Sequence, residues 1–253
     1  MFLLNLLDLE ACIKKILCIL MVLLLVASFA ACSKKGDAED DLSKYLQDEE
    51  VVDKVKTDGG DLFYIDSVDT TTVIVTGYEG SHELHEVTIP DTLAGKKVIG
   101  IGDRAFYYCN TITAVKLPAT LTSIGTYAFA GCSFLSSVTI PASVKTIGNG
   151  AFYGCERLVD LTLEAGDLTE ISEACFWGCS SLTSVEIPGS VKTVGKGAFF
   201  ACASLETLVV NEGVEEIRDQ AFQNLAKLAN VTLPETTECA PLAFAGTAWG
   251  ERK

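Results

Sequence analysis

Five cysteines recur at one position of a repeating pattern, and their thiols offer more chemistry than any other regularly spaced side chain here. They are Cys109, Cys132, Cys155, Cys179 and Cys202, at intervals of 23, 23, 24 and 23 residues. In an exported protein such thiols could pair as disulfides, and four thiolates around one point would hold zinc. The regular spacing decides between these possibilities, because it fixes how the elements that carry the thiols stack.

Stacked strands bring equivalent residues into a straight column rather than around a point. Their Cβ atoms are then about 4.8 Å apart and point the same way. A disulfide needs Cβ atoms that converge to about 3.8 Å, and zinc needs a tetrahedral ligand set. We therefore predict that these five cysteines form a column of small, buried hydrophobic residues. We predict free thiols for all seven cysteines beyond residue 32, which are Cys109, Cys132, Cys155, Cys175, Cys179, Cys202 and Cys239.

The only two histidines, His82 and His85, are three residues apart and offer little for metal binding or catalysis. Their spacing is not that of the H-E-x-x-H zinc motif, and no third ligand is near in sequence. Ser81 precedes them outside any G-x-S-x-G nucleophile motif. We expect these residues on the surface of a terminal cap, and we predict no enzyme activity, metal or cofactor.

The elements that position these side chains follow from a repeat that begins near residue 86. A phenylalanine after a small residue recurs at intervals of 23, 23, 24, 23, 23 and 22 residues. The phenylalanines are Phe106, Phe129, Phe152, Phe176, Phe199, Phe222 and Phe244. Periods of 20–29 residues are typical of leucine-rich-repeat solenoids, in which stacked repeats bury one continuous core.

Other columns keep the same register. An apolar–x–apolar triplet such as Val138-Thr139-Ile140 recurs in each repeat, which predicts a short strand with two inward side chains and one outward. A proline follows most triplets and ends the strand. Glycines such as Gly125 and Gly195 come later in the repeat, where we expect a tight turn. An inserted residue in the loop 164–167 explains the 24-residue interval.

Residues 136–158 read SSVTIPASVKTIGNGAFYGCERL and resemble the BspA-like leucine-rich repeats of bacterial surface proteins. The resemblance covers about residues 86–247. It implies a curved solenoid on a secreted or surface-attached protein, with adhesion or protein binding rather than catalysis. We expect a leucine-rich-repeat solenoid over residues 86–253, built of short parallel strands with turns or short helices. A β-hairpin over residues 61–85 would cap one end, and a degenerate repeat with Cys239 and Thr247 in place of the usual residues would cap the other.

The N-terminal segment carries an export signal. Residues 16–31 are apolar and uncharged, and they follow Lys14 and Lys15. The end Ala30-Ala31-Cys32 resembles a bacterial lipobox, which implies a signal peptide over residues 1–31 and lipidation of Cys32. The alternative is an uncleaved membrane anchor. Residues 32–60 are polar and acidic, and we interpret them as a flexible tether. We expect an extracytoplasmic, lipid-anchored protein at the cell membrane or surface.

Composition excludes two classes of function. The net charge is −15, from 19 basic and 34 acidic residues, so nucleic-acid binding is unfavourable. Hydrophobic residues make up 49% of the chain, which excludes disorder throughout.

Two surfaces are candidates for partner binding. The residue after the repeat phenylalanine is aromatic in four repeats: Tyr107, Tyr153, Trp177 and Phe200. These side chains form either an exposed stripe or packing on the turn side of the solenoid, and we favour packing. The outward strand positions are Thr88, Lys116, Thr139, Thr162, Glu186, Val209 and Thr232. This threonine-rich row, centred on Thr139, Thr162 and Glu186, is either a flat binding face or a solvated sheet.

We therefore predict a monomeric, non-catalytic lipoprotein whose solenoid binds an unknown extracellular protein or polysaccharide. The alternatives are a structural protein of the cell envelope without a specific ligand, and an accessory subunit of a surface enzyme.

Overall fold

The computed structural model describes residues 53–57 and 59–249, so the predicted signal segment 1–31 and most of the predicted tether lie outside the described residues. The described residues form strands and turns. They contain no helix that is long and apolar enough to cross a membrane. Turns rather than short helices therefore connect the predicted strands.

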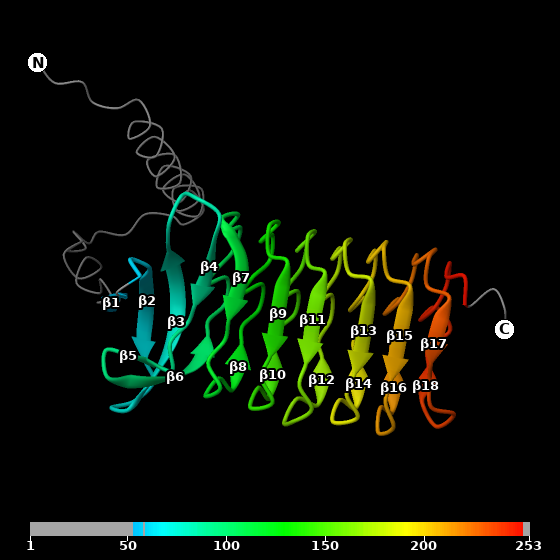
Figure 1. Ribbon diagram of the computed structural model, residues 1–253. Coiled ribbons are helices and arrows are strands. Elements are labelled where there is room, and N and C mark those ends of the chain that lie inside the picture. The colour runs from blue at the N-terminus through cyan, green and yellow to red at the C-terminus, as the bar shows by residue number, and fades with distance from the viewer. Residues whose placement is uncertain (1–52, 58, 250–253) are drawn as a thin grey trace, which may run out of the picture. The chain divides into compact units, whose positions relative to one another are not determined.

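Three antiparallel strands precede the repeats (Figure 1). They are β1 (Asp53–Lys56), β2 (Leu62–Ser67) and β3 (Thr72–Glu79). The strands β2 and β3 are the predicted hairpin, and their first four residues alternate half-buried and buried side chains. The additional strand β1 lies within the segment 32–60 that the sequence analysis interpreted as tether. Its side chains are mostly exposed, which explains why hydrophobic alternation does not reveal it.

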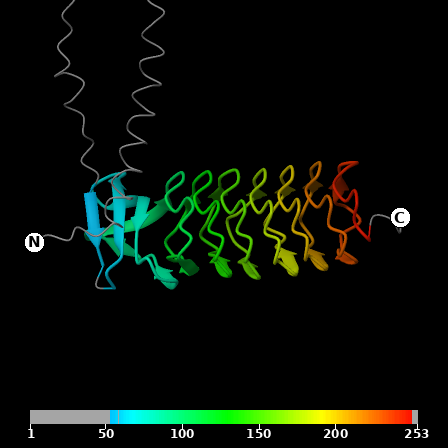
Figure 2. The same ribbon diagram turned by 90° about the horizontal axis from the view of Figure 1, so that it is seen from above.

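Seven rungs follow, and each contributes one strand to each of two columns (Figures 1 and 2). The first column contains β4 (His85–Thr88), β7 (Ile112–Lys116), β9 (Ser137–Ile140), β11 (Asp160–Leu163), β13 (Ser184–Ile187), β15 (Thr207–Val210) and β17 (Asn230–Thr232). The second contains β6 (Lys96–Ile101), β8 (Ser123–Ile124), β10 (Thr146–Ile147), β12 (Glu170–Ile171), β14 (Thr193–Val194), β16 (Glu216–Ile217) and β18 (Glu238–Cys239).

Paired strands within each column are parallel and in register, so that Thr139 lies beside Thr162 and Glu186 beside Val209. The short strand β5 (Thr92–Leu93) is an exception, because it turns back antiparallel onto β6. Strand β3 pairs in parallel with β6, which joins the cap to the first rung. The predicted leucine-rich-repeat solenoid with a repeat of 23 residues is confirmed.

The inserted residue produces a seam at the fourth rung. In the first column β11 pairs with β9 of the rung before, and strand pairing resumes between β13 and β15. In the second column β12 pairs instead with β14 of the rung after. Each strand of the fourth rung therefore pairs with a strand of one neighbouring rung and not of the other. The turns of the fourth rung keep backbone hydrogen bonds to both neighbours: Phe152 N donates to Cys175 O at 2.8 Å, and Phe176 N donates to Ala198 O at 2.8 Å.

The repeat phenylalanines form a continuous stack, the phenylalanine ladder, through the core. Neighbouring rings from Phe106 to Phe244 have centroids 4.8–5.3 Å apart and planes within 5–15° of each other. This spacing matches the distance between neighbouring strands, about 4.8 Å. Six of the seven rings are fully buried, and only Phe244 of the last rung keeps 8% exposure. Trp249 packs on Phe244 at 4.7 Å and covers part of this last ring.

The repeat glycines have a different role from the tight turn that we expected. Gly102, Gly125, Gly148 and Gly195 all have ordinary, negative-φ or extended backbone angles. A Cβ atom on Gly125 would lie 2.6 Å from the backbone N of Asp103, and one on Gly195 would lie 2.7 Å from Ile171 O. Glycine is needed because the backbone of the preceding rung passes too close for any side chain.

We expect the substitution Phe152→Ala to lower the free energy of unfolding by about 3–5 kcal/mol, because it leaves a cavity between two stacked rings. Urea denaturation of the wild-type chain and the variant measures the loss. Tyr153→Ala is the matched control, since its side chain is 42% exposed. Equal losses in the two variants would contradict a core role for the ladder.

Candidate functional site

The cysteine column lies beside the phenylalanine ladder, and its thiols bond to backbone. Each buried thiol donates to the carbonyl oxygen of the ladder phenylalanine one rung earlier, at 3.1–3.4 Å. The pairs are Cys132 with Phe106, Cys155 with Phe129, Cys179 with Phe152, and Cys202 with Phe176. None of the seven cysteines in the described residues is joined in a disulfide. The cysteine side chains therefore fill space in the core and also donate a hydrogen bond to the phenylalanine carbonyl oxygens.

Burial suppresses the reactivity of these thiols. It raises the pKa of Cys155 and of Cys202 from 9.0 to about 12, and that of the half-buried Cys109 to about 11. The pKa of Cys132 and of Cys179 is raised in the same direction by burial and by the neighbouring thiols. Because the thiolate is the nucleophile and the metal ligand, these groups are inert at neutral pH.

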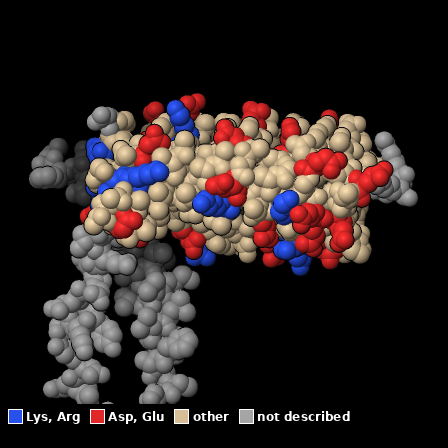
Figure 3. All heavy atoms as spheres, turned by 90° about the horizontal axis from the view of Figure 1, so that it is seen from below, with Lys and Arg blue, Asp and Glu red and all other residues tan. Residues whose placement is uncertain are grey.

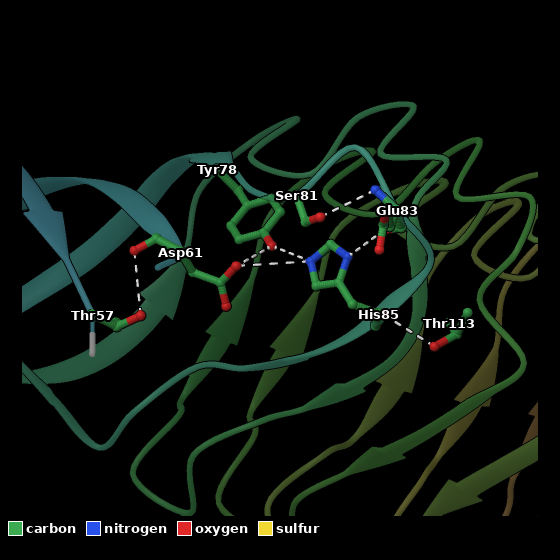
Figure 4. Close-up of polar contacts among 7 residues, drawn as sticks. All are labelled: Thr57, Asp61, Tyr78, Ser81, Glu83, His85 and Thr113. Carbon is green, nitrogen blue, oxygen red and sulfur yellow. Dashed lines mark hydrogen bonds and ion pairs between the residues drawn. The ribbon is translucent and has the colours of Figure 1, made fainter. Parts of the chain in front are cut away.

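A polar cluster at the cap brings together residues that are distant in the repeat pattern (Figure 4). The hydroxyl oxygen of Tyr78 lies 2.7 Å from Asp61 Oδ1 and 2.7 Å from His85 Nε2. His85 Nδ1 lies 2.7 Å from the carbonyl oxygen of Glu83, whose own N–H donates to Ser81 Oγ at 3.1 Å. Sequence reasoning placed His85 on the cap surface but did not find Asp61 or Tyr78.

The hydroxyl group of Tyr78 connects the cluster. The carbonyl oxygen of Glu83 only accepts, so His85 Nδ1 donates to it. The Tyr78 hydroxyl has a single proton and faces both Asp61 Oδ1 and His85 Nε2. His85 Nε2 is also 3.7 Å from Asp61 Oδ1, so the three side chains form one connected cluster.

This cluster holds the cap against the first rung. Burial and the neighbouring Asp61 carboxylate raise the pKa of Tyr78 well above its usual value of 10, so the phenol stays protonated. Its ring stacks on Phe106 at 5.0 Å and contacts Phe63 at 5.4 Å, which extends the ladder into the cap. An open pocket of about 930 Å³ adjoins it, lined in part by Asp61, Ser81 and His85. No group of three or more metal-ligating side chains occurs in the part of the chain that the structure describes.

The aromatic stripe of Tyr107, Tyr153, Trp177 and Phe200 divides into two parts. Tyr107 and Tyr153 are 47% and 42% exposed. Trp177 and Phe200 are half-buried and stack on each other at 4.1 Å, and Tyr153 stacks less closely on Trp177 at 6.1 Å. Ala130 interrupts the stripe in the second rung. Trp177 and Phe200 in the later rungs are packed as we predicted, whereas Tyr107 and Tyr153 in the earlier rungs face solvent.

Two further tyrosines and an arginine join this exposed part. Tyr108 and Tyr127 are 60% and 36% exposed. With Arg104, Tyr107 and Tyr153 they line a pocket of about 400 Å³ in the first three rungs. We call these five residues the tyrosine pocket. Sequence reasoning missed Arg104, Tyr108 and Tyr127, although each occupies a column in which later repeats have glycine.

The outward strand row is exposed along the first column. Thr139 and Thr162 lie side by side and line a groove of about 410 Å³ with Lys116, Asp160 and other residues. Glu186 lies across the seam and accepts a hydrogen bond from Asn211 Nδ2 at 2.8 Å. The row is therefore split by the seam rather than continuous.

Charged side chains are unevenly distributed over the solenoid. On the face in Figure 3 acidic and basic side chains are interspersed, and the acidic ones are densest over the C-terminal rungs. Arg218 bridges Glu170 and Glu216 there, at 3.0 and 3.2 Å, and Lys192 pairs with Glu215 at 3.2 Å. These pairs are about half-exposed or more and contribute little to stability.

Comparison with known proteins finds the repeats in a described family. The model of the BspA type leucine rich repeat region matches residues 71–180 and 99–229, in six copies. Among curated proteins no relative matches the chain.

Three solved structures illustrate the similarity. A leucine-rich repeat protein of T. pallidum is 31% identical, with a TM-score of 0.65 over 70% of this chain and 82% of that one. A leucine-rich cell surface protein of Faecalibacterium prausnitzii is 32% identical, with a TM-score of 0.59 over 73% of this chain and 50% of that one. A leucine-rich repeat protein of Eubacterium ventriosum shares the fold at 22% identity, with a TM-score of 0.64 over 78% and 50%. The chain spans about half the length of the latter two.

The buried thiols predict a loss of stability at alkaline pH. Above pH 9 the unfolded chain loses thiol protons that folded Cys155 and Cys202 retain up to about pH 12. Each thiol therefore lowers the free energy of unfolding by about 1.4 kcal/mol between pH 8 and pH 10. Urea denaturation with reductant at the two pH values measures this.

The double variant Cys155→Ala, Cys202→Ala should show a smaller fall in stability between pH 8 and pH 10. Cys239→Ala, at an exposed position, should leave the fall unchanged. An identical pH dependence in all three chains would contradict burial as the cause.

Proposed function

Because the chain belongs to the BspA-type leucine-rich repeat family, we propose that it is an exported, membrane-anchored protein whose solenoid binds a macromolecular partner outside the cell. The partner is an extracellular protein or a polysaccharide. Binding takes place through side chains on the surface of the rungs, without catalysis.

The exposed aromatic side chains of the first three rungs carry this proposal. A fold with a complete phenylalanine ladder has no packing need for them, yet Tyr107, Tyr108, Tyr127 and Tyr153 are 36–60% exposed. Aromatic residues dominate the binding energy of many interfaces because they bury a large area with few rotatable bonds. A repeat solenoid presents such residues over an extended surface.

The polar cluster at the cap favours a structural role over a catalytic one. His85 is fixed by Glu83 and Tyr78, and the hydroxyl of Ser81 accepts from the backbone N–H of Glu83 and donates to no base among the described residues. General-base catalysis of a serine needs the hydroxyl bonded to the base. This arrangement supports a binding protein over an enzyme. A structural envelope protein without a ligand is the competing function, and pull-down from cell-surface extracts separates the two.

The N-terminal segment supports the anchor. Residues 16–31 are apolar, end in Ala30-Ala31 and are followed by Cys32, which is the order of a lipoprotein signal. A single acyl chain binds membranes only marginally, and lipoprotein modification adds more than one. The acidic residues that follow would keep the solenoid away from an anionic membrane surface.

Replacing Cys32 with Ala should abolish incorporation of radiolabelled fatty acid by cells that express the full-length chain, because the acceptor thiol is lost. Cys18→Ala, within the same segment, is the matched control and should keep the label. Undiminished labelling of the Cys32 variant would exclude this anchor.

Changing Tyr153 and Trp177 together to Ala should weaken binding to a captured partner by about ten-fold or more, as expected for interface aromatics. Binding is measured with the full-length chain, and circular dichroism checks the fold. The pair Thr139→Ala, Thr162→Ala tests the strand row in parallel. Unchanged binding in the aromatic variant with a loss in the threonine variant would move the binding face to the first strand column.

A further inference from the structure

We propose that the tyrosine pocket, formed by Arg104, Tyr107, Tyr108, Tyr127 and Tyr153, is a binding site for a neutral, hexose-type glycan. This inference rests on the proposed function and names the ligand class of one of its surfaces.

The polar groups of the pocket are available to a ligand. None of the four phenol hydroxyls, nor the Arg104 guanidinium, has a hydrogen-bond or ion-pair partner among residues 53–57 and 59–249. The cap tyrosines differ, because Tyr64 bonds to Glu79 at 2.8 Å and Tyr78 to Asp61 at 2.7 Å. A 400 Å³ pocket with ring faces and unused hydroxyl groups suits a ligand that combines apolar C–H faces with hydroxyls.

Three of the five residues occupy backbone positions that disfavour them. Arg104, Tyr108 and Tyr127 have φ of 56°, 56° and 54°, in the left-handed region where a Cβ crowds the following carbonyl oxygen. In the same columns later rungs mostly have glycine or alanine, for example Gly150 at 61° and Ala201 at 59°, and the sixth rung has Gln220 and Asn224 at 62°. The left-handed angle is thus a property of the column, and the first two rungs fill it with two rings and a guanidinium where small residues suffice; strained positions are concentrated at functional sites.

Packing does not account for the two rings. Tyr108 is 60% exposed and lies over Gly131, where a Cβ would be 2.8 Å from the ring. Tyr127 lies over Gly150 in the same way, one rung further. Each ring therefore lies against glycine backbone on one side and keeps 36–60% exposure, and Tyr107 contacts Tyr108 in a T-shaped arrangement with ring centroids 4.5 Å apart. The cluster thus offers exposed aromatic surface on which a sugar ring can stack.

Charge selects a neutral ligand. Arg104 lines the pocket and repels a cation, so the aromatic residues do not form a cage for an ammonium group. The adjacent Asp103 carboxylate is occupied by the backbone N–H of Thr126 at 2.6 Å. The net charge of −15 opposes the approach of a polyanion. Neither Arg104 nor the net negative charge of the chain repels a neutral glycan, and Arg104 can donate hydrogen bonds to its hydroxyl groups.

The backbone around the pocket excludes recognition of an extended peptide by strand addition. Arg104 N donates to Thr126 O at 3.0 Å, Tyr108 N to Ala130 O at 2.9 Å and Tyr127 N to Asn149 O at 3.0 Å. These groups are already used between rungs, whereas strand addition needs unpaired backbone groups. Recognition must use side chains, as stacking and hydroxyl bonding to a sugar do.

The test is calorimetric titration of the full-length chain with neutral hexasaccharides: cello-, laminari-, malto- and mannohexaose. Hexagalacturonate is the anionic comparison. We expect at least one neutral hexasaccharide to bind, and hexagalacturonate to bind more weakly. Tyr108→Gly and Tyr127→Gly should each weaken binding by about ten-fold or more. Arg104→Gly should weaken it in the same direction.

Glycine is the substitution of choice because it fits the positive φ, so these variants should keep or raise the melting temperature. Asn224→Gly and Gln220→Gly are the matched controls: their φ is also 62° in the corresponding columns of a later rung, and binding should be unchanged. Absence of binding to all four neutral hexasaccharides, tighter binding of hexagalacturonate, or full binding by Tyr108→Gly would each overturn the proposal.

The outcomes also separate this inference from the proposed function. If a macromolecular partner is captured from surface extracts and no hexasaccharide binds, the glycan site is wrong and the binding function stands. If a hexasaccharide binds through the pocket and competes with a captured partner, both are supported. If neither is bound, both fail.

Discussion

Stacking of the phenylalanine ladder sets the geometry on which the remaining columns depend. The rings are 4.8–5.3 Å apart and nearly parallel, so each rung must repeat the position of the one before within a narrow tolerance. That spacing leaves no room for a Cβ on Gly125 or Gly195, and it brings each cysteine thiol to the carbonyl of the preceding phenylalanine. Even the inserted residue at the fourth rung is absorbed in the strand columns, while the ladder and the turns continue through it. The interior is therefore fully determined by repetition.

Repetition also limits what the molecule can do. In-register columns keep equivalent groups parallel, so the thiols of the cysteine column do not converge on a metal, and the ion pairs that form between rungs, such as Lys192 with Glu215, lie on the exposed surface. The cluster of Asp61, Tyr78 and His85 arises where the cap meets the first rung: the antiparallel strands β2 and β3 bring Asp61 to Tyr78, and His85 begins the first-rung strand β4. Function in the rungs must come from side chains that differ between repeats, such as those that line the tyrosine pocket of the first three rungs.

Features that recur in every repeat were predicted from the sequence, whereas features of single rungs or of the cap were not. Intervals between phenylalanines and apolar triplets predicted the rungs, the core and the free thiols, because periodicity records burial. The sequence did not decide between turns and short helices as connections, because the segments between the strands show no helical period of hydrophobic residues. Strand β1 was not predicted because its side chains are mostly exposed. The repeat glycines were attributed to turns, since close approach between rungs is a property of the stack and not of one repeat. Arg104, Tyr108 and Tyr127 were missed because positive φ cannot be read from hydrophobic pattern, although glycine at the equivalent places in later repeats was a usable signal.

Three aromatic residues and the glycines of the next rung form coupled pairs, and two of the three, Tyr108 and Tyr127, have positive φ. Tyr108 covers Gly131, Tyr127 covers Gly150 and Trp177 covers Gly197, and a Cβ on any of these glycines would collide with the ring. A residue in the left-handed region costs about 1–2 kcal/mol, which a solenoid can tolerate because its stability is close to a sum over repeats and their interfaces. At these three places the ring requires a glycine in the following rung, and the glycine in turn gives the ring a backbone surface to lie on. In the first three rungs this pairing presents ring faces to solvent, whereas in the fourth and fifth the ring of Phe200 packs on Trp177 and closes the same surface.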